Sequence, residues 1–501
     1  MMNFKKLSLS KKLYQLIIHR LDGNQINSSS YRTYIYSLIQ KGIGGFILFG
    51  GQKDNIRNFI LELQSYSEIP LFIASDIERG VGQQVLGCTN FPCQMAIAAA
   101  INTNSKEDSL LLESMLKAIA TEAHYIGLNM PLIPVLDINL NPDNPIICTR
   151  AFSDNPEKVS WFGNKYIKIL EENGLISCAK HFPGHGDTSE DSHLNLPVIK
   201  KSMNELMNIE LKPFKEAIKQ GVSSIMIGHL LLPEIDNMPA SLSYNVTTNL
   251  LRNKMDFNGL VLSDALNMNA LKDIENISAL CVRAGADILL HPDDPDITVK
   301  ELLSAIELKI ISEQLIDKAV NRILNAKQKM KRIIKNVIDY KFHKELSFQI
   351  AEKSITFVKN TKGIIPIEEN ENISIILAGD EEYFNDCHFK NAFSKVYTLK
   401  DIKDIIIKNT EKIIVTIFTS VSAWKGSSGI ADIEKDYIRR LIMKSSCSII
   451  ISFGSPYVLR HFTDADILIA AYEPSLQAQI SVLNCLSGKT KFTGTLPVTL
   501  F

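Results

Sequence analysis

The sequence of 501 residues lacks any apolar run as long as the roughly 18 residues that a membrane-spanning helix requires. We therefore expect no membrane span. It also lacks a basic excess: 54 lysines and arginines face 55 aspartates and glutamates, for a net charge of −1. Because nucleic acids and anionic membranes usually select a basic surface, we expect no nucleic-acid partner.

The N-terminal segment has lysines but neither a long apolar stretch nor a small-residue cleavage site. It therefore predicts no signal peptide. The eight cysteines are scattered, with no CxxC pair, which is typical of reduced thiols in a chain without an export signal. These features together predict a cytoplasmic protein.

A short apolar run that ends in a polar residue, followed by an amphipathic helical pattern, recurs through the first two thirds of the sequence. The runs span residues 15–21, 44–50, 71–76, 131–139, 175–181, 223–229, 259–264 and 286–292. Helical patterns at 155–174 and 203–221 are examples of the intervening segments. Eight such units predict an α/β fold with parallel strands, namely a (β/α)8 TIM barrel. A doubly wound open sheet is the alternative arrangement of the same elements.

A second alternating block follows a lysine-rich helical stretch at 312–336, which we interpret as the last barrel helix leading into a linker. Its apolar runs span residues 372–380, 411–420, 447–456 and 465–473, and the segment 494–501 closes it. This block predicts a smaller α/β sandwich. The expected division is a catalytic barrel at 1–335, a linker at 336–350 and the sandwich at 351–501.

Polar or ionisable residues end most of the predicted barrel strands. They are Asp76, Asp137, Lys180, His181, His229, Asp264 and His291. The active sites of α/β barrels lie at the carboxyl ends of the strands. We therefore expect a polar pocket at this rim, with Asp137 as the first candidate for a buried structural partner.

The segment AKHFPGHGDTSEDSHLNLP at 179–197 is the richest in chemical groups, and its proline and glycines predict a loop. Three interpretations compete. Asp191 and His193 can form a dyad in which the carboxylate fixes a proton-transferring imidazole. The histidines and carboxylates can instead bind a metal, although their spacings fit no tight zinc signature. The histidines can also be structural loop residues.

Each remaining candidate has a structural interpretation beside the functional one. Asp264 is either a carboxylate nucleophile or a helix N-cap. Asp76 and Glu78 can accept hydrogen bonds from sugar hydroxyls, or form an ion pair with Arg79 or another basic residue. Arg150, in a long loop rich in proline and asparagine, is either a positioned or a surface arginine.

Four segments together resemble the family 3 glycoside hydrolases, in particular bacterial β-N-acetylglucosaminidases of cell-wall recycling. KHFPGHGDTSEDSHLNLP at 180–197 resembles the signature K-H-F-P-G-H-G-D-T-x-x-D-S-H-x-x-L-P almost throughout. Residues 132–156 resemble the family's segment from P-V-x-D to R-x-F, and residues 239–268 resemble its nucleophile segment. EKSITFVKN and FTGTLPVTL resemble the start and end of its second domain. The resemblance covers nearly the whole chain.

The resemblance implies a role for each matching residue. Asp264 would be the nucleophile, and His193 the acid/base, oriented by Asp191. The residues implied to hold the hydroxyls of the terminal sugar are Asp76, Arg150, Lys180 and His181. A histidine acid/base is implied for the N-acetylglucosaminidase branch, since the β-glucosidases of the family use a glutamate from elsewhere.

The implied activity is that of a retaining β-N-acetylglucosaminidase acting on a carbohydrate substrate, without metal or organic cofactor. The natural substrate would be a GlcNAc-containing glycoside or muropeptide from peptidoglycan turnover. A β-N-acetylglucosaminide phosphorylase or another family 3 β-glycosidase is the alternative within the fold. An inactive sugar-binding relative and a metal-dependent hydrolase are alternatives of other classes.

The sequence departs from the family at one place. The usual run D-x-E-G-G-R-V-x-R is replaced by DIERGVGQQ at residues 76–84, so that Gln84 stands where the final arginine is often a substrate contact. An amide reproduces neither the charge nor the fork of a guanidinium group. Arg79 is the candidate to compensate.

Overall fold

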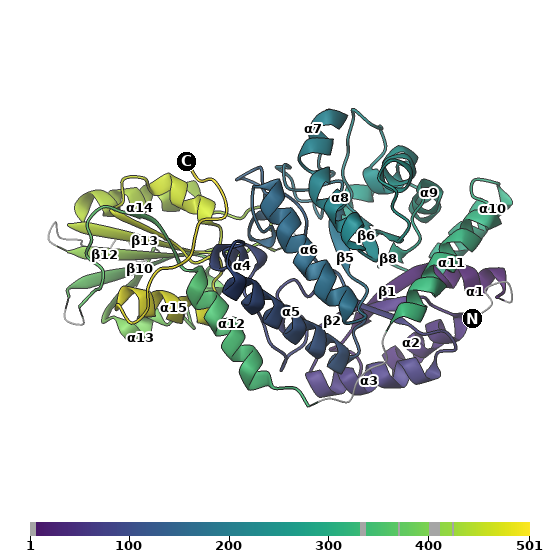
Figure 1. Cartoon of the computed structure of the whole chain (residues 1–501), viewed down its shortest axis with the longest axis horizontal. Helices are drawn as coiled ribbons and strands as arrows, with labels where there is room; N and C mark the ends of the chain where they lie inside the picture. Colours follow the sequence, from purple (N-terminus) through teal and green to yellow (C-terminus); the bar gives the residue numbers. More distant parts are fainter. Residues whose placement is uncertain (1–6, 331–336, 369–370, 400–410, 423–424) are drawn as a thin grey trace. The chain divides into compact units, whose positions relative to one another are not determined.

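The computed structural model describes residues 7–330, 337–368, 371–399, 411–422 and 425–501, which form two compact units (Figure 1). The first unit runs to Phe91 and includes Glu113–Ile138 and Pro156–His343. The second comprises Pro92–Leu112, Asn139–Asn155 and the residues from Lys344 onward.

All eight predicted strands of the first unit are present, and every pair is parallel. They are β1 (Ile17–Asp22), β2 (Gly45–Phe49), β3 (Phe72–Ser75), β4 (Met130–Pro131), β5 (Cys178–Phe182), β6 (Ser224–Ile227), β7 (Leu260–Ser263) and β8 (Leu289–Leu290). One sheet has the order β4-β3-β2-β1-β8 and another the order β5-β6-β7. Isolated parallel bridges pair Val135 with Lys180 and Leu262 with Ile288. Because β8 lies beside β1, the order favours the barrel over a doubly wound sheet.

Helices alternate with strands along both units of the chain. In chain order they are α1 (Leu9–Gln15), α2 (Ser29–Lys41), α3 (Lys53–Tyr66), α4 (Gln94–Ala100), α5 (Lys106–Ile126), α6 (Pro156–Glu172), α7 (Met203–Asn208), α8 (Leu211–Gln220), α9 (Ile277–Ala284), α10 (Pro295–Glu307), α11 (Glu313–Lys329), α12 (Tyr340–Ser354), α13 (Phe389–Ala392), α14 (Asp432–Lys444) and α15 (Leu476–Leu486). Figure 1 shows α6 and α8 packed side by side. Among the described helices, none is long and apolar enough to cross a membrane.

The helical pattern at 203–221 forms two helices, α7 and α8, so the prediction of one continuous helix there is wrong. The first ends at Asn208 and the second begins at Leu211. Pro213 explains the division, since a proline has no N–H to donate and is tolerated in the first turn of a helix but not in its interior. The helix predicted at 155–174 is confirmed as α6.

The second unit contains a six-stranded sheet of order β11-β10-β12-β13-β14-β9, in which only β9 runs antiparallel to its neighbour. Its strands are β9 (Thr356–Asn360), β10 (Ile373–Gly379), β11 (Lys395–Thr398), β12 (Lys412–Phe418), β13 (Cys447–Phe453) and β14 (Ile467–Ala470). Apolar side chains of successive strand residues are buried in two separate clusters, as expected for an α/β sandwich. The four predicted strands are present, and the two edge strands are additional.

The expected linker at 336–350 lies mostly in helix α12. Residue 336, and the end of the lysine-rich stretch at 331–336, lie outside the described residues. The division into residues 1–335 and 351–501 stays a prediction.

Candidate active site

The carboxyl ends of the central strands meet at one edge, where several of the predicted site residues lie. Ile227 at the end of β6 pairs with both Phe182 of β5 and Ser263 of β7. The backbone N–H of Asp264 then donates to the carbonyl of Ile227 at 3.0 Å. His229 follows β6 at the same edge. The parallel pairing therefore gathers these side chains, as the sequence predicts.

Asp137 is a buried structural partner, which confirms the interpretation made for it. Its side chain has no exposed surface. One carboxylate oxygen accepts from Nδ1 of His181 at 2.6 Å, and the other accepts from the backbone N–H of His185 at 2.6 Å. Burial acts to raise its pKa, but the two histidines and these hydrogen bonds outweigh burial and lower the pKa of Asp137. An ionised carboxylate thus fixes the ring of His181.

Lys180 is buried between two carboxylates. Its side chain is 2% exposed, and Nζ lies 2.7 Å from Oδ1 of Asp76 and 2.8 Å from Oε1 of Glu78. The structural interpretation of Glu78, an ion pair with a basic residue, is thereby correct, with Lys180 as the partner. Asp76 is 31% exposed, so that its carboxylate is oriented by the lysine and still accessible.

His185 stabilises the loop that follows β5. Its ring nitrogens contact the hydroxyls of Thr188 at 2.8 Å and Ser192 at 3.1 Å, so the structural interpretation applies to this histidine. A Cβ atom at Gly186 would lie 1.7 Å from the carbonyl oxygen of Ile138. Only glycine therefore permits this approach of the loop to the backbone.

Asp191 and His193 form the predicted pair. One carboxylate oxygen of Asp191 accepts from Nδ1 of His193 at 2.8 Å and from its backbone N–H at 2.9 Å. The aspartate side chain is fully buried, and that of the histidine is 24% exposed. The carboxylate therefore orients the ring so that Nε2 lies on the side away from Asp191.

Asp264 carries an ionised carboxylate in a buried environment. Burial acts to raise its pKa, but the surrounding histidines, with His181 first and His229 second, and the N–H of Ala265 outweigh burial and lower the pKa of Asp264. That N–H donates to Oδ1 at 2.8 Å. The N-cap interpretation is not supported, because the next helical turn begins at Asn269 and is preceded by Met268.

Arg150 belongs to the second unit, in the turn Cys148–Arg150. Its Nη1 donates to the carbonyl of Ile146 at 3.1 Å, and its own carbonyl accepts from Gln94 at 2.8 Å. These contacts make it a positioned arginine. A role toward a substrate stays a prediction.

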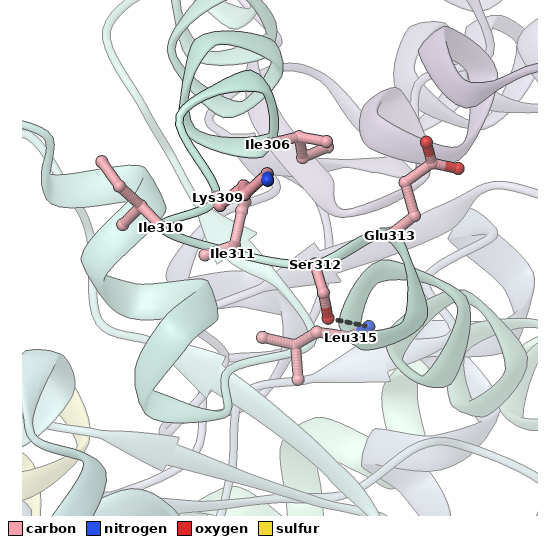
Figure 2. A pocket seen from close by; sticks show the side chains of 7 residues that line it. All are labelled: Ile306, Lys309, Ile310, Ile311, Ser312, Glu313 and Leu315. Carbon is pink, nitrogen blue, oxygen red and sulfur yellow. Dashed lines mark hydrogen bonds between the residues drawn. The ribbon is translucent and has the colours of Figure 1, made fainter.

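A hollow elsewhere in the first unit has a different character. It lies at the turn between α10 and α11, where Figure 2 shows mainly aliphatic side chains and the bond from the N–H of Leu315 to Ser312. None of the residues that line this hollow is among the predicted site residues. No cluster of metal-ligating side chains occurs in the described part of the chain.

Several hydroxyl partners of the site were not predicted. Ser241 lies 2.7 Å from Nδ1 of His229, and Thr188 and Ser192 contact His185. Serine and threonine are common in loops, so nothing in their spacing distinguishes these from solvent-exposed hydroxyls. His229 was predicted only as a polar strand end, without a role.

These features define an α/β protein with a polar site at the carboxyl ends of parallel strands. In this site a histidine–aspartate pair stands near a second, ionised carboxylate. The family model for the glycosyl hydrolase family 3 N-terminal domain matches residues 8–326, and the chain belongs to this family. The resemblance found in the sequence is confirmed.

Relatives and solved structures agree with this assignment. The chain is 31% identical over 381 residues to beta-hexosaminidase A of Pseudoalteromonas piscicida, covering 68% of this chain but 63% of that protein, less than two thirds of its length. A glycoside hydrolase family 3 beta-N-acetylglucosaminidase from Paenibacillus sp. strain FPU-7 is 28% identical, with a TM-score of 0.84 and 99% of each chain covered. A beta-glucoside phosphorylase has a similar fold, with a TM-score of 0.88 at 24% identity over 99% of this chain and 95% of that one.

The stability of the first unit should depend on pH through His185. Burial, opposed only in part by Asp137, lowers its pKa to about 4, whereas the unfolded chain takes up this proton near pH 6.5. The stability linked to this group is complete above the unfolded pKa and is lost as the pH falls toward 4. When the pH is lowered from 7 to 5, the unfolding free energy should fall in both proteins. The decrease in His185→Gln should be smaller than that in the wild type by about 2 kcal/mol. Chemical denaturation at both pH values measures this difference.

His388→Gln is the matched control, because His388 belongs to the second unit and is only partly buried. This variant should keep the pH dependence of the wild type. An unchanged pH dependence in His185→Gln would contradict the assignment of a neutral, buried His185.

Proposed function

We propose that this chain is a retaining β-N-acetylglucosaminidase that removes terminal β-linked N-acetylglucosamine. The observation that carries the proposal is the pair His193–Asp191, joined at 2.8 Å and close enough to Asp264 to help lower its pKa. A retaining glycosidase needs one proton donor and one separate ionised carboxylate. The names of the related beta-hexosaminidase and beta-N-acetylglucosaminidase support the choice of sugar.

The proposed reaction is a double displacement. The Asp264 carboxylate attacks the anomeric carbon while Nε2 of His193 gives its proton to the leaving oxygen, whose bond to that carbon breaks. A covalent glycosyl-enzyme forms on Asp264. His193 then takes a proton from water, which attacks the same carbon and releases N-acetylglucosamine with retained configuration. Asp191 stabilises the charged imidazole whenever His193 is protonated.

The terminal sugar would be held by hydrogen bonds that acidic side chains accept from its hydroxyls and that basic side chains donate to them. Asp76, Lys180 and His181 are already fixed by ion pairs or buried hydrogen bonds, which lowers the entropy lost on binding. We also assign Arg150 to this group, from the match of its segment to the family pattern. Gln84 would leave one family contact unmade.

The natural substrate proposed is a GlcNAc-terminated muropeptide or disaccharide from peptidoglycan turnover, cleaved in the cytoplasm. No metal or organic cofactor is required by this mechanism. We further infer that the eight strands close into a (β/α)8 barrel over residues 1–335, followed by the linker and a sandwich at 351–501.

A phosphorylase is the second candidate, and the acid/base histidine favours it. A histidine is neutral or cationic, so it repels an anionic phosphate less than a glutamate would. Phosphate in place of water would release the sugar 1-phosphate. The fold shared with a beta-glucoside phosphorylase is compatible with this acceptor.

Release of nitrophenol from the 4-nitrophenyl β-glycosides of N-acetylglucosamine and of glucose tests the proposal. We expect activity on the GlcNAc compound, unaffected by EDTA. Acceleration by phosphate would favour the phosphorylase, and loss with EDTA a metal-dependent hydrolase. Preference for the glucose compound would favour another family 3 β-glycosidase. Binding of N-acetylglucosamine without turnover of either compound would favour an inactive sugar-binding relative.

Replacement of the nucleophile should abolish turnover without unfolding the chain. Asp264→Asn should lower kcat for the GlcNAc glycoside by about 1,000-fold or more, because an amide is a poor nucleophile. Asp256→Asn is the matched control, since Asp256 is exposed and lies in the loop before β7. It should retain full activity, and circular dichroism should be unchanged in both. Normal activity in Asp264→Asn would exclude it as nucleophile.

Loss of the acid should depend on the leaving group. His193→Ala should slow an alkyl or sugar aglycone by about 100-fold or more, but a dinitrophenyl aglycone much less, because a dinitrophenolate needs little protonation. Measurement of kcat/KM across aglycones of graded pKa gives the dependence. Equal losses for all aglycones would argue against an acid role for His193.

A further inference from the structure

His229 is a buried histidine next to the candidate nucleophile with no role in the mechanism above. Its side chain has no exposed surface. Nδ1 lies 2.7 Å from the hydroxyl of Ser241, and Nε2 lies 3.0 Å from the carbonyl oxygen of Ala265. Neither contact reaches a carboxylate.

The two partners determine which nitrogen carries the proton. A carbonyl oxygen can only accept, so Nε2 must carry the hydrogen and donate it to Ala265. Burial lowers the pKa of His229 more than the nearby Asp264 raises it. In the neutral ring Nδ1 then accepts from the Ser241 hydroxyl. His229 is therefore a fixed neutral donor and unsuited to exchanging protons.

The bond to Ala265 completes a set of restraints on the segment that carries the nucleophile. The N–H of Asp264 donates to Ile227 of β6 at 3.0 Å, and the N–H of Leu266 donates to Leu290 of β8 at 2.9 Å. His229 holds the carbonyl of Ala265 between them. The N–H of that same Ala265 donates to Oδ1 of Asp264 at 2.8 Å. Rotation of the backbone at Ala265 would therefore move the donor that orients the carboxylate.

We propose that His229 is a positioning residue that fixes the Ala265 backbone and thereby aims the Asp264 carboxylate at the anomeric carbon. This inference rests on the proposed function, in which Asp264 is the nucleophile. Oδ1 is held by Ala265, whereas no described residue donates a hydrogen bond to Oδ2. Oδ2 is then the attacking atom, and its direction depends on the restraint at Ala265. Misplacement of a reacting atom by about 1 Å can slow a reaction by about 100-fold.

A covalent trap measures the nucleophile separately from the acid. The probe is the 2,4-dinitrophenyl β-glycoside of a 5-fluoro N-acetylglucosamine. The Asp264 carboxylate forms a bond to the anomeric carbon, and dinitrophenolate leaves with the bonding electrons without needing a proton. Fluorine slows both steps, so the adduct accumulates. Intact-mass spectrometry against time gives the maximal labelling rate and the half-saturating probe concentration.

His229→Ala should lower the maximal labelling rate about 10- to 100-fold and leave the half-saturating concentration unchanged. His229→Gln should recover most of the rate, because its amide can donate to Ala265 and accept from Ser241. Ser241→Ala should lower the same rate by a smaller factor, and it tests the inference if His229→Ala does not fold.

His343→Ala is the matched control, because His343 is also a buried histidine of the first unit and bonds Glu122 at 2.6 Å. It should lower the unfolding midpoint and leave the labelling rate unchanged. Wild-type labelling rates in folded His229→Ala, or a change only in the half-saturating concentration, would overturn the positioning role. Absence of any adduct on Asp264 in the wild type would overturn the proposed function, and this inference with it.

Discussion

The first unit depends on burying an ionised carboxylate, Asp137, without leaving its charge unpaired. Such a group is tolerated only when hydrogen bonds and nearby positive charge replace its hydration. His181 provides a ring N–H and His185 a backbone N–H. The first belongs to strand β5 and the second to the loop after it. One carboxylate therefore couples the strand end to the loop that bears Asp191 and His193.

The same principle determines the state of the other ionisable groups at the rim. Lys180 is almost completely buried and is balanced by Asp76 and Glu78. Asp264 has no lysine or arginine partner among the described residues and is stabilised by nearby histidines and one backbone N–H. This difference matters chemically. A carboxylate held in a tight ion pair is a poor nucleophile, whereas one stabilised by more distant charge and a single hydrogen bond stays ionised and reactive.

The sequence predicts the helices and strands that are marked by apolar periodicity. It predicts their bounds poorly where a single residue, such as a proline, interrupts the backbone hydrogen bonds. All eight strands predicted for the first unit are present, yet the run at 131–139 yields only the two-residue strand β4. Pro131 and Pro134 lack N–H groups and cannot continue a ladder. The edge strands β9 and β11 were missed because most of their residues are only partly buried or exposed, so that apolar alternation is weak. The candidate site was predictable at the strand ends, where ionisable residues interrupt apolar runs.

The sequence could not distinguish the histidines by role, because the role depends on the partner that folding supplies. His181 and His193 each direct Nδ1 at a buried carboxylate, which fixes the orientation of the ring. His229 meets a carbonyl and a hydroxyl instead, which stabilise one neutral tautomer. An imidazole ring that is paired with a carboxylate can accept a proton and return it. A ring whose N–H donates to a backbone carbonyl can instead fix the position of that carbonyl. The partners of Nδ1 and Nε2, which no sequence motif reveals, thus distinguish His229 from the two histidines that are paired with carboxylates.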